Sequence, residues 1–338
     1  MEQYLENLKR EISLRGYDEE YINTCVKYAT RLKENNLPVI FDLIHLALLL
    51  GITDENILHI IYSEEYFYKI AHIPKKNGKT REINIPSNQL KYIQRWILDN
   101  ILYNIKISEY ATGFCKKKSI VDNAKVHVNN TCLINMDIKD FFTSIKFHEV
   151  YKIFKYYGYT KEISFALTKL CTFQGKLPQG SPTSPVLSNI VCLKLDKRLS
   201  LLAKKYNATY TRYADDITFS GSSGIEKVKE ICEKILHDEQ FEVNMAKTRI
   251  SYHHERQEVT GLIVNNGQIS INRKYKREIY KNLYYCKKYG VNSHLDMIKS
   301  NKLFYKEHMY GKAYFVKMIE PNEGKKILDL LDEIEWDY

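Results

Sequence analysis

The sequence predicts an α+β fold in which helices back small antiparallel sheets. Three stretches read as β-hairpins, each with a turn between two β-prone runs: Tyr68–Pro86, Thr209–Ser220 and Val259–Ile271. The longer stretches between them place apolar residues at helical spacing instead. Because the two strands of a hairpin run antiparallel, we expect the sheets to be antiparallel as well.

The central hairpin, Thr209–Ser220, carries two adjacent carboxylates, Asp215 and Asp216, at its tip. Asp-Asp pairs are common in solvated turns, so the pair alone decides little. A turn between two strands rich in Tyr, Ile and Phe need not be solvated, however. A half-buried pair of carboxylates is costly without a cation beside it, and oxygen ligands suit a hard ion such as Mg²⁺.

A third acid, Asp137, stands near the end of the short apolar run Cys132–Ile138. If that run is a strand beside the hairpin, Asp137 faces Asp215 and Asp216. Three such carboxylates can hold two Mg²⁺ ions about 3.5–4 Å apart, as in enzymes of in-line phosphoryl displacement. One ion would activate the attacking hydroxyl, and the other would stabilise the leaving pyrophosphate.

The composition indicates two or three lobes and an affinity for polyanions. The chain has 338 residues, 44% of them hydrophobic, and a formal net charge of +10 from 51 Lys+Arg against 41 Asp+Glu. Such a bias also serves solubility, but a basic surface attracts nucleic acid. The 27 tyrosines can stack on bases or fill a core, and the count does not decide between these roles.

The cysteine pattern and the apolar runs predict a cytoplasmic protein that does not enter a membrane. The seven cysteines form no Cys-x-x-Cys pair and are expected to be reduced and mostly buried. No signal peptide opens the sequence. The most apolar run, Leu37–Ile52, contains Asp42 and His45 and is too short to span a bilayer.

The first 62 residues are expected to be helical. Residues 2–35 have helical periodicity, Val39–Leu50 is predicted to be a buried helix, and Thr53 is a candidate N-cap for a helix over Asp54–Tyr62. This outline is similar to a DNA-binding helix-turn-helix. Its second helix contains Ile57-Leu58-His59-Ile60-Ile61, which is too apolar to read base edges well, so structural packing is favoured.

Five sequence blocks occur in an order typical of one enzyme family: Ile73–Pro86, Asn135–Ile145, Leu177–Ile190, Tyr210–Ser220 and Asn244–Arg249. The third block contains Pro-Gln-Gly-Ser-Pro-Thr-Ser-Pro, a string that is hard to obtain by chance. With these blocks, the chain resembles reverse transcriptases and, within them, the bacterial retron reverse transcriptases. The resemblance covers nearly the whole chain from about Ile73 onward.

The resemblance implies a right-hand polymerase with fingers, an antiparallel palm sheet and a thumb. We expect residues 1–62 to form an N-terminal helical extension and residues 63–268 to form the fingers and palm. Residues 269–338 would then form a helical, RNA-binding thumb. The resemblance also implies that Asp137, Asp215 and Asp216 are the catalytic residues and the ligands of two Mg²⁺ ions.

The resemblance further assigns a pocket for the incoming dNTP. Lys79 and Arg81 would contact the triphosphate, Arg81 being better suited because its guanidinium binds phosphate oxygens in pairs. Phe142 would lie under the sugar and exclude a 2′-hydroxyl. Gln179 and Gly180 would border the pocket, and Lys247 would protonate or neutralise the pyrophosphate.

Without the resemblance, these residues also fit ordinary structural roles. Lys79 and Arg81 suit a solvated basic hairpin, Phe142 a core position and Lys247 an exposed surface. Neighbours at a strand exit point opposite ways, so Phe141 is the better candidate for the core.

Two further signatures are characteristic of retron enzymes and imply contacts with the cognate RNA. Asn123 and His127 belong to the first, and Val259-Thr260-Gly261 forms the second. Taken alone, the first pair suits a helix surface and the second an ordinary strand. The predicted helix over residues 273–289 mixes basic residues with tyrosines, and Arg273, Lys274 and Arg277 would grip RNA phosphates there.

The function implied is an RNA-directed DNA polymerase that copies a structured non-coding RNA into a branched RNA–DNA hybrid (msDNA), primed from an RNA 2′-hydroxyl. Its partners would be that RNA, the DNA product, dNTPs and an effector protein of an anti-phage defence system. Two alternatives stay open: a bacterial reverse transcriptase with an ordinary 3′ primer, and an RNA-binding scaffold without catalysis. The intact Asp137, Asp215, Asp216, Gln179 and Arg81 argue against the scaffold.

Overall fold

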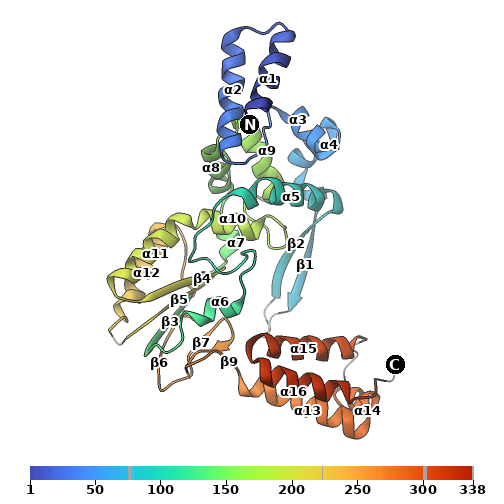
Figure 1. The fold of residues 1–338 in the computed structure, drawn as a ribbon, viewed down its shortest axis with the longest axis vertical. Helices are drawn as coiled ribbons and strands as arrows, with labels where there is room; N and C mark the ends of the chain where they lie inside the picture. The colour runs from blue at the N-terminus through green and yellow to red at the C-terminus, as the bar shows by residue number, and fades with distance from the viewer. Residues whose placement is uncertain (75–77, 79, 223, 266, 300–302, 337–338) are drawn as a thin grey trace.

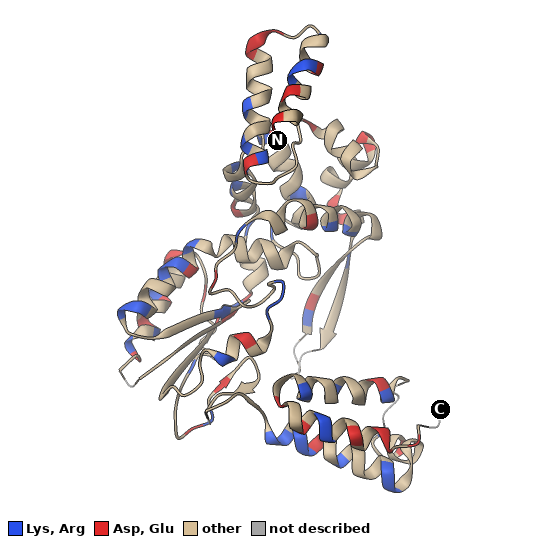
Figure 2. Ribbon diagram, in the orientation of Figure 1, with Lys and Arg blue, Asp and Glu red and all other residues tan. Residues whose placement is uncertain are grey.

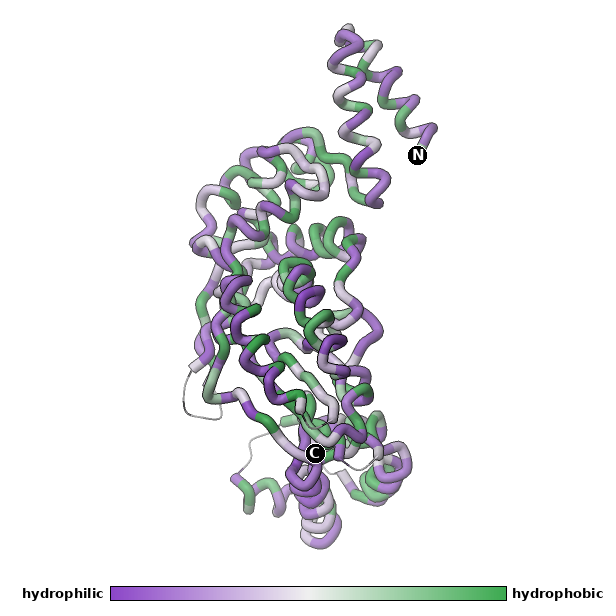
Figure 3. The backbone as a smooth tube through the Cα atoms, turned by 90° about the vertical axis from the view of Figure 1, so that its left-hand side faces the viewer, coloured by the Kyte–Doolittle hydropathy of each residue, from purple (hydrophilic) through white to green (hydrophobic). Residues whose placement is uncertain are grey.

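The fold is that of a computed structural model, which describes residues 1–336 apart from 75–77, 79, 223, 266 and 300–302. The molecule is elongated, with the N-terminal helices at one end and the C-terminal helices at the other (Figure 1). A four-stranded sheet and a long hairpin lie between these ends. Turned by 90°, the first two helices project beyond the rest of the chain (Figure 3).

The N-terminal region holds four helices: α1 (Glu2–Leu14), α2 (Glu19–Glu34), α3 (Leu43–Leu50) and α4 (Asp54–Tyr62). The single helical stretch predicted over residues 2–35 is interrupted, because Gly16 has a φ of 79° and Asp18 starts a new helix by accepting a hydrogen bond from the Tyr21 N–H. The predicted cap on α4 is confirmed, since the Thr53 hydroxyl accepts from the Asn56 N–H.

The helix predicted over Val39–Leu50 begins only at Leu43, where the Asp42 carboxylate caps it at the His45 N–H. In the described part of the chain, no single helix is long and apolar enough to cross a membrane. Only α3 and α4 taken together, bent by 104°, meet that test on length and composition.

The fingers are built on a long antiparallel hairpin of β1 (Tyr68–Pro74) and β2 (Thr80–Pro86). The helix α5 (Asn88–Asn100) packs against β2, α9 (Lys161–Cys171) packs against α5, and α8 (Phe147–Tyr157) packs against α9. The end of β1 and the start of β2 point toward the C-terminal helices in Figure 1.

The palm sheet has the strand order β4-β5-β3-β6, and every neighbouring pair is antiparallel, as predicted. Its strands are β3 (Cys132–Asp137), β4 (Thr209–Tyr213), β5 (Asp216–Gly221) and β6 (Arg249–Tyr252). The helices packed beside it are α10 (Ser184–Val191), α11 (Leu193–Lys205) and α12 (Lys227–Asp238). The long helix predicted over Val186–Lys204 is therefore two helices, which meet at Cys192.

Two short helices precede and follow β3, and a second small sheet leads into the thumb. The short helices are α6 (Ile120–Lys125) and α7 (Phe141–Ser144). The small sheet contains β7 (Glu258–Val259), β8 (Leu262–Ile263) and β9 (Ser270–Ile271). The thumb helices are α13 (Arg273–Tyr289), α14 (Val291–Met297), α15 (Tyr305–Ile319) and α16 (Pro321–Asp332).

Apolar side chains form two separate cores. The larger core joins residues of the N-terminal helices, the fingers and the palm. The smaller core lies among the thumb helices and also takes in Ala124 of α6 and Leu133 of β3. The thumb is therefore connected to the palm by buried packing as well as by the chain. The domain boundaries at residues 62 and 268 stay a prediction.

Two glycines of the thumb differ in the space around them. A Cβ atom at Gly324 would lie 2.2 Å from Lys317 Cα, whereas nothing lies within 4 Å of one at Gly311. Alanine favours a helix over glycine by up to about 1 kcal/mol, so Gly311→Ala should stabilise the protein by about that amount. Gly324→Ala should instead cost about 1–3 kcal/mol, because the clash with α15 outweighs the propensity gain.

Urea unfolding followed by circular dichroism measures both changes. The two substitutions are matched in chemistry, and each lies on a thumb helix. Equal shifts of the same sign would contradict the close crossing of α15 and α16.

Candidate active site

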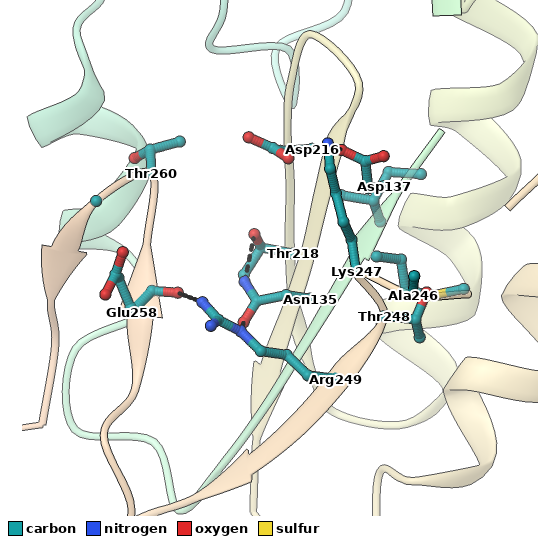
Figure 4. Close-up of a pocket in the computed structure, with 13 residues that line it drawn as sticks. Asn135, Asp137, Asp216, Thr218, Ala246, Lys247, Thr248, Arg249, Glu258 and Thr260 are labelled. Atoms are coloured by element: carbon teal, nitrogen blue, oxygen red, sulfur yellow. Dashed lines mark hydrogen bonds and ion pairs between the residues drawn. The ribbon is translucent and has the colours of Figure 1, made fainter. Parts of the chain in front are cut away.

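Strand pairing brings the three predicted acids together. Asp137 is the last residue of β3 and lies directly opposite Asp216, the first residue of β5. The next backbone N–H, that of Ile138, donates to the Asp215 carbonyl oxygen at 3.0 Å. The expectation that Asp137 faces the Asp-Asp hairpin is thereby confirmed, and Figure 4 shows Asp137 and Asp216 at one end of a common pocket.

The turn that carries Asp215 is tight and closely backed. Tyr213 pairs with Asp216, so only Ala214 and Asp215 lie between the strands. Ala214 has a φ of 57°, a left-handed conformation that is uncommon for a residue with a Cβ. Gly113 packs behind the turn, and a Cβ there would lie 2.6 Å from the Ala214 nitrogen. Any larger residue at position 113 would displace the turn.

The site concentrates negative charge. Burial, followed by the charges of Asp215 and Asp137, raises the pKa of Asp216 to about 6. The pKa of Asp215 is also raised, by burial first and then by Asp137. The Asp216 side chain still reaches solvent through the pocket, so a cation could approach it. A divalent cation would relieve the repulsion that raises these pKa values.

Lys247 and Asn244 hold the carboxylate of Asp137, which is only 4% exposed. The Lys247 ammonium donates to Oδ2 at 2.6 Å, and the Asn244 amide donates to Oδ1 at 2.9 Å. This contact with Asp137 raises the pKa of Lys247. Sequence reasoning missed Asn244 as a site residue, and its only signal was its place in the block Asn244–Arg249.

Lys247 contacts Asp137, and the three carboxylates do not converge on a single point. Among the residues that the structure describes, no three His, Cys, Asp or Glu side chains converge into a metal-binding group as they stand. The donor set nevertheless suits a hard divalent ion, since all three side chains offer carboxylate oxygens and two have raised pKa values.

The loop of Gln179 and Gly180 docks against the fingers strand β2. The Asn84 N–H donates to the Gln179 carbonyl oxygen at 2.7 Å. Gly180 has a φ of 128°, and a Cβ there would lie 2.5 Å from the Asn84 carbonyl oxygen, so only glycine fits. Arg81, on the same strand, is exposed, and its charge partly opposes the rise in the Asp215 pKa that burial causes. The charge of Arg81 thus reaches the acids, whereas Gln179 and Gly180 contact the strand β2. Lys79 lies outside the described residues.

Phe141 and Phe142 divide as the sequence predicts. Phe141 is buried in the main core, with 3% of its surface exposed. Phe142 is half-buried, and its ring lies 5.8 Å from that of Phe114. Both lie in α7, which follows Asp137 closely in the chain, so the half-buried ring of Phe142 is held near the strand end that carries the acid.

Asn123 and His127 are both fully buried. Asn123 accepts from the Thr112 hydroxyl at 2.7 Å and donates to the Thr260 hydroxyl at 3.4 Å. His127 makes hydrogen bonds of 2.7 and 2.8 Å with hydroxyls of the palm strands β5 and β4. Burial lowers the pKa of His127 to about 3, so it is neutral.

The packing gives Asn123 and His127 an internal role. They tie the segment around α6 to the palm sheet and to the β7–β8 turn. Their predicted contact with RNA is not favoured by this packing, because neither side chain offers an exposed atom. The sequence could not reveal this burial, since the hydroxyl partners are up to 137 residues away.

The Val259-Thr260-Gly261 segment forms the turn between β7 and β8. Val259 is buried in the smaller core, whereas Gly261 is exposed with a φ of 85°. Thr260 and Gly261 line a pocket of about 380 Å³ across from Asp137 and Asp216 (Figure 4). This segment therefore lies at the same pocket as Asp137 and Asp216, which their separation in sequence does not predict.

The floor of this pocket is polar. Arg249 donates to the Asn135 side-chain oxygen at 3.3 Å and to the Glu258 carbonyl oxygen at 3.5 Å. The positive charge of Arg249 also partly opposes the rise in the pKa of Asp216 that burial and the neighbouring carboxylates cause. An exposed guanidinium beside the acids is suited to a phosphate of a bound strand.

Arg273, Lys274 and Arg277 are exposed on α13, where Figure 2 shows basic residues along the helix. Three other thumb lysines form ion pairs instead: Lys276 with Glu320 at 2.7 Å, Lys287 with Glu333 at 2.5 Å and Lys312 with Glu278 at 3.0 Å. The exposed trio therefore presents a basic surface at the start of the thumb, as predicted from the sequence.

The fold and the acidic site define a reverse transcriptase. A family model described as "Reverse transcriptase (RNA-dependent DNA polymerase)" matches residues 73–265. The chain belongs to this family and is an RNA-directed DNA polymerase.

Relatives with similar sequences place it among the retron enzymes. The retron Ec86 reverse transcriptase of Escherichia coli is 32% identical over 323 residues, covering 94% of this chain and 96% of the relative. The retron Mx162 reverse transcriptase of Myxococcus xanthus is 34% identical over 298 residues, covering 78% of this chain and 60% of the relative. The chain is thus a member of the retron reverse transcriptase family.

A solved structure of telomerase from Candida albicans, in complex with a fragment of telomeric RNA, superposes with a TM-score of 0.47. The sequence identity is 11%, and the match covers 78% of this chain and 55% of that one. This likeness is too weak to add to the argument.

The raised pKa of Asp216 predicts a stability effect with a definite sign. A carboxyl group whose pKa is higher folded than unfolded binds its proton more tightly in the folded chain. Its ionisation therefore removes stability as pH rises from its ordinary pKa of 3.8 to about 6. In metal-free buffer at pH 7.5, Asp216→Asn should raise the melting temperature, by about 2 °C or more.

The same comparison at pH 4 provides the control, because the wild-type carboxyl is then largely protonated and the gain should shrink. Thermal unfolding in EDTA at both pH values measures it. A lower melting temperature for Asp216→Asn at pH 7.5 would contradict the raised pKa.

Proposed function

We propose that this protein copies a cognate structured non-coding RNA into a branched RNA–DNA hybrid, msDNA, primed from a 2′-hydroxyl of that RNA. The observation that carries the proposal is the end-to-end match to a retron enzyme, which covers 94% of this chain. The two retron signature segments support it, because they meet through Asn123 and Thr260 beside the acids. An RNA hydroxyl bound in that pocket would lie next to the catalytic residues.

The three carboxylates Asp137, Asp215 and Asp216 would hold two Mg²⁺ ions. The support is their oxygen-only donor set and the charge repulsion that raises two of their pKa values. Bound Mg²⁺ supplies activation of the attacking hydroxyl and stabilisation of the leaving pyrophosphate. Lys247, which already reaches the site, would neutralise or protonate the pyrophosphate.

The incoming dNTP would bind between the fingers strand β2 and the acids. Arg81, with Lys79, would contact its triphosphate, and the docked loop of Gln179 and Gly180 would border it. Phe142 would lie under the sugar and exclude a 2′-hydroxyl. Its half-buried ring, supported by Phe114, suits such a steric role.

The RNA and the growing hybrid would contact the basic start of the thumb and the β7–β8 turn. The exposed Arg273, Lys274 and Arg277 support the first contact, and the position of Thr260 and Gly261 in the pocket supports the second. Residues 1–62 would act as a helical extension, residues 63–268 as fingers and palm, and residues 269–338 as the thumb.

Membership of the retron family also supports a cellular role. The protein would act in the cytoplasm with an effector protein of the same anti-phage defence system. All seven cysteines are free, and six are buried, which suits a reducing compartment.

A debranching experiment tests the mode of priming. Protein expressed with its neighbouring non-coding RNA should yield DNA joined to RNA through a 2′–5′ linkage. Debranching enzyme should release that DNA, whose 5′ end then maps to one nucleotide. DNA that migrates identically with and without debranching would overturn the retron proposal and favour an ordinary 3′ primer.

The thumb surface predicts steep salt dependence of RNA binding. Each phosphate contact contributes about 0.7–0.9 to the slope of log affinity against log salt. Removing Arg273, Lys274 and Arg277 together by alanine substitution should therefore lower the slope by about 2–3. Filter binding of the cognate RNA across a range of NaCl concentrations measures it.

A matched control removes three positive charges from α1 and its C-cap: Lys9, Arg10 and Arg15, which are exposed at the far end of the molecule. This variant should keep the wild-type slope. Equal loss of slope in both variants would show that net charge, and not the thumb surface, determines binding.

A further inference from the structure

Arg212 is a fully buried arginine. It is the penultimate residue of β4, just before the turn that carries Asp215. Its Nε and Nη2 donate to the two oxygens of Asp196, each at 2.7 Å. Nη1 donates to the side-chain oxygen of Asn189 and to the main-chain oxygen of Ala214, each at 3.1 Å. A planar guanidinium is suited to several donations in fixed directions at once, which a lysine ammonium cannot reproduce.

The contact with Ala214 lies at the strained point of the turn. Ala214 has a φ of 57°, a conformation that persists in an L-residue only when its surroundings hold it. Its carbonyl oxygen is held by Arg212. One residue on, the Asp215 carbonyl oxygen is held by the Ile138 N–H at 3.0 Å. The main chain is thus fixed on both sides of the first catalytic acid of the hairpin.

Asn189 connects Arg212 to the other support of the turn. Its amide nitrogen donates to the Gly113 carbonyl oxygen at 2.9 Å, while its oxygen accepts from Arg212. Gly113 packs directly against the Ala214 nitrogen. A single buried amide, fully inaccessible to solvent, therefore links the contacts at the two ends of Ala214.

The charge of Arg212 is neutralised locally. Asp196 is also fully buried and accepts from the Tyr210 hydroxyl at 2.8 Å, which completes the hydrogen bonding around the ion pair. Arg212 has no exposed surface from which to reach a nucleotide. Any effect that it has on catalysis must therefore act through the main chain of the turn.

We propose that Arg212, supported by Asp196 and Asn189, is a positioning residue that fixes Asp215 and Asp216 in register with Asp137. The inference rests on the proposed role of these three carboxylates, and it does not depend on how synthesis is primed. Loosening this support should impair the chemical step and divalent-metal binding. Binding of the RNA template and of the dNTP should change little.

Two variants test the proposal. Arg212→Lys keeps a positive charge beside Asp196 but cannot maintain both the Asp196 pair and the Ala214 contact. Asn189→Ala removes the link to Gly113 without adding or removing a charge. This second variant tests the proposal even if Arg212→Lys does not fold. Arg198→Lys is the matched control, because Arg198 makes a similar fork at the surface of α11, to Asp238 and Glu239 at 2.7 Å each.

Steady-state synthesis on an oligo(dT)-primed poly(rA) template gives kcat and KM for dTTP. In both variants kcat should fall about 10- to 100-fold, because small misplacements of reacting groups cost this much. KM for dTTP and RNA affinity should stay within about twofold, which marks a loss specific to the chemical step. The rise in melting temperature on adding MgCl₂ should be smaller than in the wild type, a readout that does not depend on turnover.

A rescue experiment separates positioning from general stability. Glycine adopts a positive φ freely, so Ala214→Gly should restore part of the lost kcat in the Asn189→Ala background. Unchanged kcat and an unchanged Mg²⁺ response in the variants would overturn the proposal. A loss of kcat that also occurs in Arg198→Lys would overturn it too. The same holds for a loss that a smaller fraction of folded enzyme explains completely. If the wild type itself makes no DNA with Mg²⁺, the proposed carboxylate site fails instead.

Discussion

The antiparallel pairing of β3 with β5 is the contact on which the rest of the site depends. It places Asp137 opposite Asp216, although 79 positions separate them in the sequence numbering. Side chains alternate between the two faces of a strand, so a slip of one residue would turn Asp137 away from the pocket. The buried apolar residues of β3, packed in both cores, hold this register.

This arrangement assembles like charges, and the surroundings of the site show how the fold tolerates them. Asp137 is neutralised by Lys247, the charge of Arg81 opposes that of Asp215, and the charge of Arg249 opposes that of Asp216. All three cations are exposed. The buried supports of the turn, in contrast, are internally paired. The site thus combines a fixed backbone with adaptable charges.

Structural features that depend on residues close together in the chain were predictable from the sequence. The hairpin around Asp215 and Asp216, the cap at Thr53 and the helix over residues 273–289 each depend on residues close in the chain. The short apolar run Cys132–Ile138 also indicated that Asp137 stands near the end of a strand. The family resemblance then supplied the roles of residues such as Gln179, which spacing alone does not give.

What the sequence did not predict depends on distant contacts. The break at Cys192 interrupts a stretch whose helical periodicity continues, so no local signal marks it. Asn123 and His127 seemed suited to a surface by composition, but their hydroxyl partners lie in other elements. Arg212 was visible as a charged residue inside an apolar strand. Its partner Asp196 lies in the middle of a helix, and only the fold pairs the two.

The most direct test of the account is DNA synthesis by Asp137→Asn, with Asp140→Asn as the control. Asp140 is an exposed acid three residues further on that makes no side-chain cap. Asp137→Asn should abolish Mg²⁺-dependent synthesis while RNA binding persists, and Asp140→Asn should remain active. Undiminished synthesis by Asp137→Asn would contradict the claim that strand pairing builds the catalytic site around this residue.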